Sequence, residues 1–279
     1  MRAVRWTAAG KQILLAAIVA AAAALVPQPA QAQGGPPLIT DDPDTPGPGY
    51  WEINLATIFE RTRSARRLEA PLADINYGVG RRVQLKFEIP WLFGGDTGQA
   101  VRTAPGDSTV GVKWRFLGQE GQRVAWSTYP QLEVNSGHAA VRNGLVEEGR
   151  QFLMPTEFTV QFGAVEINGE AGWNFVQNGD DGWIWGITNE TEFRSGFELL
   201  GELHGEKFGS SPTSVIAEIG GRQRLTDQLT LLLAIGTGVH GSTEDRVSLR
   251  VYVGLQFNLP DQYVSPHRNG VRPFPLRLR

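Results

Sequence analysis

The chain contains no cysteine, two methionines and four histidines among its 279 residues. Without cysteine no disulfide framework can form, so an exported fold would depend on hydrogen bonding and packing. One long apolar run exists, at residues 13–26. It is shorter than the roughly 20 residues that a membrane-spanning helix needs, and no second run follows. These absences argue against a disulfide-stabilised domain and against a helical inner-membrane protein.

Residues 1–32 have the features of a secretory signal peptide. Arg2, Arg5 and Lys11 precede the apolar run, and Ala30-Gln31-Ala32 fits a small-residue cleavage site. We predict cleavage before Gln33. Removal of this leader leaves 23 basic residues against 29 acidic ones, so no basic surplus supports nucleic-acid binding.

Twelve segments after the leader alternate apolar and polar residues with a period of two. In the last one, Val253 and Leu255 share one face while Arg250 and Gln256 share the other. We predict strands at 50–62, 68–77, 81–91, 108–117, 123–135, 152–162, 164–176, 182–194, 197–208, 214–224, 229–239 and 246–259. Most have about 10–13 residues, the length of a tilted strand that crosses a bilayer. The pattern predicts an all-β protein, a closed antiparallel transmembrane β-barrel of about 12 strands.

The connections between the strands predict the topology. Short turns at 78–80, 117–121, 163, 195–196 and 226–227 alternate with a set that includes two long, polar loops, 92–107 and 136–151. Bacterial barrels have short periplasmic turns and longer external loops, so we expect a periplasmic N-terminus. The predicted organisation is a signal peptide (1–32), an N-terminal periplasmic or luminal segment (33–49), the barrel (50–259) and a Pro/Arg-rich periplasmic tail (260–279).

Aromatic residues of outward parity gather at both ends of the strands. The periplasmic set is Trp51, Trp114, Phe116, Trp126, Phe162, Phe193 and Phe257, and the opposite set is Phe59, Trp91, Phe152, Trp173, Phe175, Trp183 and Trp185. Two aromatic girdles are typical of membrane barrels, whereas a soluble β-sandwich buries its aromatics in mid-strand. We therefore expect a location in the outer membrane of a Gram-negative bacterium, with its lipid as a partner.

The opposite parity carries charges that would each cost about 2–4 kcal/mol in the middle of the hydrocarbon. They must face the interior, where they either pair and fill it or line a wet passage. Twelve strands give a diameter of roughly 24 Å, which leaves a cavity unless 33–49, 92–107 or 136–151 folds inside. The predicted pore-lining residues are Lys86, Glu88, Lys113, Arg115, Glu133, Glu166, Glu170, Glu190, Glu192, Glu198, Glu202, His204, Glu206, Glu218, Arg222, Arg224 and Arg250.

The final strand carries a second motif. Tyr252, Gly254, Phe257 and Leu259 have a spacing that resembles the recognition signal of the barrel-assembly machinery, which we expect as a partner. The alternative is an ordinary lipid-facing strand. Such signals usually end the chain, whereas residues 260–279 follow this one.

Two clusters invite chemical interpretations. Asp41, Asp42 and Asp44 could bind a hard cation, but Asx-turns leading into the first strand explain them better. His240, Ser242 and an acid share one loop, but nothing resembling a nucleophile elbow surrounds the serine. We predict no metal, no cofactor and no enzyme activity.

Several short motifs extend over nearly the whole mature chain. They include Pro36-Pro37-Leu38-Ile39-Thr40-Asp41-Asp42-Pro43, Gly49-Tyr50-Trp51-Glu52, Gly111-Val112-Lys113-Trp114-Arg115-Phe116 and Leu225-Thr226-Asp227. The chain thereby resembles the outer-membrane, transporter-like barrels of the MetA-pathway phenol-degradation family. That resemblance implies an outer-membrane barrel, in some members linked to aromatic compounds, and supplies no catalytic residues.

The leading functional hypothesis is an outer-membrane channel or transporter for small molecules. The alternatives are an occluded structural or adhesive barrel without transport and a barrel enzyme. The charged inner face favours polar solutes, since the strands show no apolar pocket.

Overall fold

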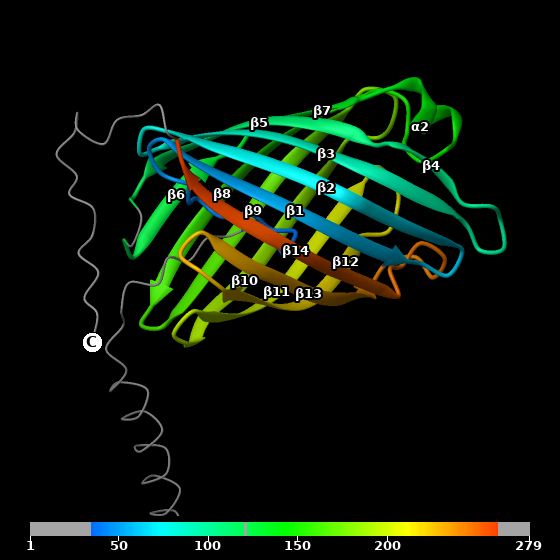
Figure 1. The fold of residues 1–279 in the computed structure, drawn as a ribbon. Helices are drawn as coiled ribbons and strands as arrows, with labels where there is room; N and C mark the ends of the chain where they lie inside the picture. The colour runs from blue at the N-terminus through cyan, green and yellow to red at the C-terminus, as the bar shows by residue number, and fades with distance from the viewer. Residues whose placement is uncertain (1–34, 120–121, 262–279) are drawn as a thin grey trace, which may run out of the picture.

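The alternating segments form a single closed β-barrel (Figure 1). A computed structural model describes residues 35–119 and 122–261. Its elements are β1 (Tyr50–Arg61), β2 (Ala65–Val79), β3 (Val83–Asp96), β4 (Arg102–Pro105), β5 (Asp107–Leu117), β6 (Val124–Thr128), β7 (Gln131–Asn135), α2 (His138–Arg142), β8 (Arg150–Phe162), β9 (Val165–Val176), β10 (Gly182–Arg194), β11 (Phe197–Phe208), β12 (Ser214–Arg224), β13 (Leu229–His240) and β14 (Leu249–Pro260). The predicted signal peptide and nearly all of the predicted tail lie outside the described residues.

These fourteen segments make a barrel of 12 antiparallel strands. β4 and β5 both pair with β3 and together form one strand of the wall. In the same way, β6 and β7 together form another single strand. The sheet closes on itself because β1 pairs with both β2 and β14, from Tyr50 opposite Pro260 to Arg61 opposite Leu249. The predicted fold class is confirmed.

The period-two pattern separates the two faces of the wall. Leu55, Val112 and Leu255 are exposed on the outside, as are the aromatic residues Trp114 and Trp173. Residues of the opposite parity are mostly buried inside the barrel. No helix among the described residues is long and apolar enough to span a membrane.

The structure corrects several predicted boundaries. The strand predicted at 123–135 is interrupted at Tyr129 and Pro130, because proline has no N–H for the ladder. The predicted last strand, 246–259, begins at Leu249, because Arg246 donates its N–H to Ser242 and closes a turn. The loops predicted at 92–107 and 136–151 contain the end of β3 with β4, and helix α2, respectively.

Residues 35–49, which we call the plug, enter the barrel before β1. Their hydrogen bonds lead to inner-face side chains of β5, β9, β11 and β12, and they belong to no strand. Pro37 and Pro43 are among the most deeply buried residues, and Thr40 is 1% exposed. The interior of the barrel is therefore occupied by the chain's own N-terminal segment.

Candidate functional site: a plugged bore

The middle of the plug is bound through its backbone to acidic side chains of the wall. The N–H groups of Ile39 and Thr40 donate to the two carboxylate oxygens of Glu202, at 3.0 and 2.6 Å. Asp41 donates its N–H to Glu170 at 3.4 Å, and the Thr40 hydroxyl lies 3.3 Å from Nδ1 of His204. These contacts hold Ile39, Thr40 and Asp41 against the wall at the level of Glu170, Glu202 and His204.

Basic side chains of β5 bind the acidic part of the plug. Lys113 Nζ donates to Asp41 Oδ1 at 2.7 Å and to the carbonyl oxygen of Asp42, and it also lies 3.7 Å from Glu157 of the wall. Arg115 donates to the carboxylate of Asp44. We call these two contacts the β5 latch. Lys113 is 1% exposed, so its charge depends on these partners for compensation.

The electrostatics of the latch favour an ionised Asp41. Burial inside the bore opposes its ionisation, but the charges of Lys113 and Lys86 outweigh this effect and hold the pKa of Asp41 below its usual value. Asp41 is therefore charged at neutral pH, and the latch is an ion pair.

A third contact secures the start of the plug. Arg222 of β12 donates to the carbonyl oxygens of Pro36 and Gly35, at 3.1 and 3.3 Å. The same guanidinium pairs with Glu190 at 2.8 Å and lies 3.5 Å from Glu198. Arg222 thus connects two strands of the wall to the plug.

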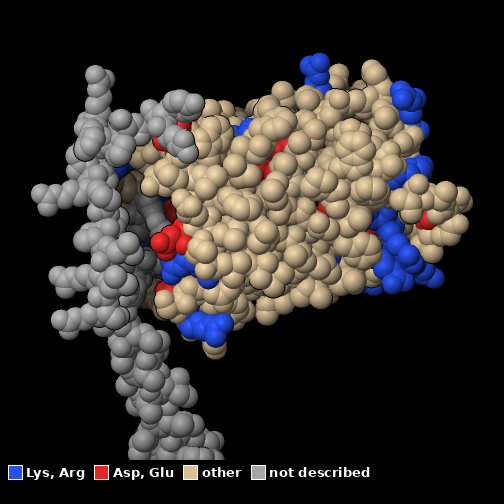
Figure 2. Space-filling model, in the orientation of Figure 1, with Lys and Arg blue, Asp and Glu red and all other residues tan. Residues whose placement is uncertain are grey.

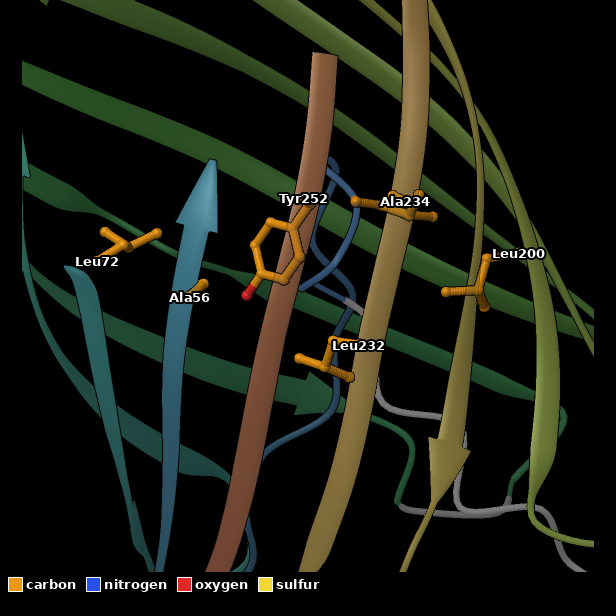
Figure 3. Packing of buried hydrophobic residues seen from close by; sticks show 7 residues of the cluster. Ala56, Leu72, Leu200, Leu232, Ala234 and Tyr252 are labelled. Carbon is orange, nitrogen blue, oxygen red and sulfur yellow. The ribbon is translucent and has the colours of Figure 1, made fainter. Parts of the chain in front are cut away.

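Leu38 of the plug packs into an apolar patch on the inner wall. The patch consists of Ala56, Leu72, Leu200, Leu232, Ala234 and Tyr252, with Ile58 beside it. Figure 3 shows these side chains coming from β1, β2, β11, β13 and β14, with the plug running past them. The inner wall therefore carries an apolar patch that the sequence reading, with its emphasis on charge, did not anticipate. Inward-facing leucines interrupt the polar parity on these strands, and Leu38 covers them.

Small residues of the wall make room for the plug. A Cβ added to Gly186 would lie 1.8 Å from Oγ1 of Thr40, and one on Gly78 would lie 1.7 Å from the carbonyl oxygen of Gly47. A polar cavity of about 20 Å³ remains between the plug and the wall, lined by residues that include Asp41, Lys113 and Glu52. This volume is about that needed for one water molecule, so the plug and the wall lie close together at this pocket.

The predicted pore-lining residues share the inner face of the wall but have different surroundings. Lys113, Arg115, Glu170, Glu202, His204 and Arg222 contact the plug. Other members pair within the wall: Lys86 with Glu88 at 2.9 Å, Arg250 with Glu218 at 2.9 Å, and Glu206 with His204 at 3.3 Å. Glu133 bonds Gln151, Glu192 accepts from the Gly196 N–H, and Glu166 lies directly opposite Glu190. Arg224 is exposed near the end of its strand. Their role in lining a pore stays a prediction.

Sequence reasoning missed several inner-wall residues that shape the site. Glu157 is fully buried beside Lys113, and Tyr129 is fully buried with its ring 4.7 Å from Lys113 Nζ. Asp74 lies 3.5 Å from Lys86. Asp74 and Glu157 have the inward parity of charged residues that were identified, so the same alternation signal could have found them. Tyr129 lies at the break in the strand, where that signal fails.

Residues that follow α2 contact the barrel at the end opposite Tyr50 and Pro260. Arg67 donates to the carbonyl oxygen of Leu145 at 3.2 Å, and Asn143 donates to that of Thr103 at 3.2 Å. A Cβ on Gly94 of the inner wall would lie 3.0 Å from the Leu145 side chain. The segment after α2 therefore contacts β2, β3 and β4 at this end of the barrel.

Three further features singled out from the sequence are the loop around Ser242, the possible metal ligands and the assembly signal of the last strand. Ser242 donates its hydroxyl to Asp245 at 2.6 Å and accepts the Asp245 N–H, which is the geometry of a turn. Within residues 35–119 and 122–261, no group of three or more His, Asp or Glu side chains is placed to hold a metal ion. In the predicted assembly signal, Tyr252 and Gly254 face inward, and Phe257 and Leu259 lie half-buried on the outer parity. Recognition by the assembly machinery stays a prediction.

Comparison with solved structures places the fold among outer-membrane channels. The COG4313 outer membrane channel from Pseudomonas putida F1 is similar, with a TM-score of 0.66 and 12% identity over 80% of this chain and 100% of that one. The KdgM porin in complex with disordered oligogalacturonate has a TM-score of 0.55 and 11% identity, over 75% and 99% of the two chains. The NanC porin has a TM-score of 0.52 and 8% identity, over 74% and 100%. No protein-family model and no curated protein matches the sequence. The chain has the fold of outer-membrane channels and porins.

Proposed function

We propose that this protein is an outer-membrane channel for small molecules and that the plug closes its bore in the state described. The observation that carries the proposal is how the plug is held. It contributes no strand to the wall. Gly49, next to β1, bonds the backbone of Gly78 and Asp261, whereas residues 35–42 are bound by wall side chains such as Glu202 and Lys113, so they can leave while every ladder hydrogen bond of the barrel remains. Once hydrated, the exposed inner wall would be the charged surface of a water-filled channel.

The orientation that we propose places both ends of the barrel wall, Tyr50 and Pro260, in the periplasm. Supporting this, the connections on their side are short, such as 163–164 and 195–196, whereas 97–106 and 136–149 lie at the other end. Short periplasmic turns and longer external loops are the rule in bacterial barrels. Signal-peptide cleavage after residue 32 and insertion by the assembly machinery belong to the same proposal.

For the solute, we infer a small molecule that combines an apolar group with a charged or polar one. If the plug left, the apolar patch that Leu38 covers would become exposed to the bore. It lies on the same inner wall as Arg250 and other charged side chains. The resemblance to barrels linked to aromatic catabolism points in the same direction. Benzoate and acetate carry the same charge, so proteoliposomes can compare them. Leu232→Ser should lower the ratio of benzoate to acetate flux while Leu232→Ile keeps it, and an unchanged ratio would refute the inference.

The channel itself is tested by the flux of small polar solutes through proteoliposomes. A variant lacking residues 36–46 should admit them much faster than the wild type. Lys86→Met is the matched control, because Lys86 forms its ion pairs with Asp74 and Glu88 of the wall and acts on Asp41 only through its charge, so it should stay far more closed than the deletion variant. Absence of flux through a folded deletion variant would favour the alternative of a sealed, structural barrel.

A further inference from the structure

Two arginines stand side by side on the outer face of the barrel. Arg61 ends β1 and lies directly opposite Arg66 of β2 in the strand register, and both side chains are exposed. Arg61 continues the outward series of Leu55, Thr57 and Phe59, so the pair faces the membrane side of the wall. Directly opposed residues have their Cβ atoms about 4.5–5.5 Å apart, which brings two positive charges close together.

The pair has no counter-charge within the described part of the chain. Neither guanidinium forms an ion pair or a side-chain hydrogen bond there. The neighbouring arginines differ, since Arg67 pairs with Glu69 at 3.0 Å and Arg63 lies 3.4 Å from Glu244. Like charges placed directly opposite each other destabilise a sheet. A bound anion would reduce the repulsion between the two guanidinium groups.

The register shows what lies on either side of the pair. In its own row, Leu249 flanks Arg61 and Gly95 flanks Arg66, with the backbone of Ala100 close to Gly95, so no acidic side chain intervenes. Two residues toward the middle of the barrel, the outward row is entirely apolar: Val251, Phe59, Leu68 and Phe93. The two rows are about 7 Å apart along the strands, at about 3.3 Å per residue.

We propose that Arg61 and Arg66 form a binding site for the phosphate group of an anionic lipid in the outer leaflet. Guanidinium groups bind phosphate through paired hydrogen bonds, and two of them match a doubly charged headgroup. The apolar row of Val251, Phe59, Leu68 and Phe93 would contact the acyl chains of the same lipid molecule. A free phosphate ion has no such chains. Figure 2 shows Lys and Arg gathered at this end of the barrel, with few charges on the middle of the visible wall.

The test measures binding of bisphosphorylated lipid A to the full-length, refolded barrel by native mass spectrometry. The double variant R61Q/R66Q should bind lipid A at least tenfold more weakly than the wild type, and both should bind dephosphorylated lipid A equally weakly. R61K/R66K keeps the positive charges but loses the paired N–H donors of the guanidinium groups. Its affinity for lipid A should lie between those of the wild type and R61Q/R66Q. R81Q/R82Q removes two exposed arginines at the opposite end of the barrel and should bind like the wild type.

Three results would overturn the proposal. Wild-type affinity in a folded R61Q/R66Q protein would exclude the site, and an equal loss in R81Q/R82Q would show non-specific charge attraction. Full competition by millimolar inorganic phosphate would identify a site for free anions instead of a lipid. Because binding is measured without conductance, failure of this proposal would leave the channel proposal untouched.

Discussion

Replacing Lys113 by Met should release the plug. The substitution keeps the length of the side chain and removes the ammonium group that binds Asp41 and the Asp42 carbonyl oxygen. In the plugged state, the carboxyl group of Asp41, which is 20% exposed, would lose its closest cation, and the fully buried carboxyl group of Glu157 would lose the same neighbour. Removing one member of a buried ion pair costs about 3–5 kcal/mol.

That cost acts almost entirely on the closed state, because Asp41 becomes hydrated once the plug leaves. Since about 1.4 kcal/mol corresponds to a tenfold change, the ratio of open to closed molecules should rise by roughly 100-fold to a few thousand-fold. The expected result is a protein that folds normally and opens far more often.

The absence of cysteine makes the assay direct. Thr40→Cys places one thiol in the plug at a position that is 1% exposed. A membrane-impermeant maleimide should react slowly with this protein and at least 100-fold faster when Lys113→Met is added. Lys86→Met is the control, because Lys86 forms its ion pairs in the wall and acts on Asp41 only through its charge, so labelling should rise far less than with Lys113→Met. Equal labelling rates in the Lys113 and Lys86 variants would refute the reasoning.

Three further outcomes follow from the geometry. Gly186→Ala should also expose a cysteine at position 40 to maleimide, because its Cβ would overlap the plug, whereas Gly137→Ala, which has open space around it, should not. Leu255→Arg should impair assembly, measured by heat-modifiable gel mobility, since a lipid-facing charge costs about 2–4 kcal/mol. Glu170→Gln should assemble nearly normally, and equal behaviour of the two would invalidate the assignment of faces. An epitope tag within 143–148 should be reachable on intact cells and one at 163–164 should not, and the reverse would invert the orientation.

The wall could be predicted from the sequence because its physics is local. Alternation every second residue assigns Lys113 to the inside and Val112 to the outside without knowledge of any partner. Pro130 was visible too, and a proline inside a predicted strand should have indicated the break between β6 and β7.

The site was harder to predict because its contacts join distant parts of the chain. Lys113 binds Asp41, which is 72 residues away, and Glu202 binds Thr40, which is 162 residues away. The period of a strand says which face a residue occupies and not what fills the space beyond it. Gly186 is an example. It matters because it has no side chain at the place where Thr40 packs, and strand periodicity cannot reveal this. Leu232 and Leu200 carried a readable signal, namely leucines at inward positions, that an emphasis on charge overlooked.

We expect residues 35–49 to close a barrel that otherwise conducts. Single-channel recording in planar bilayers tests it most directly, by comparing the wild type with the variant that lacks residues 36–46. We expect no conductance or only brief, small openings for the wild type, and a long-lived, larger conductance for the deletion variant. Identical traces from the two folded proteins would contradict it.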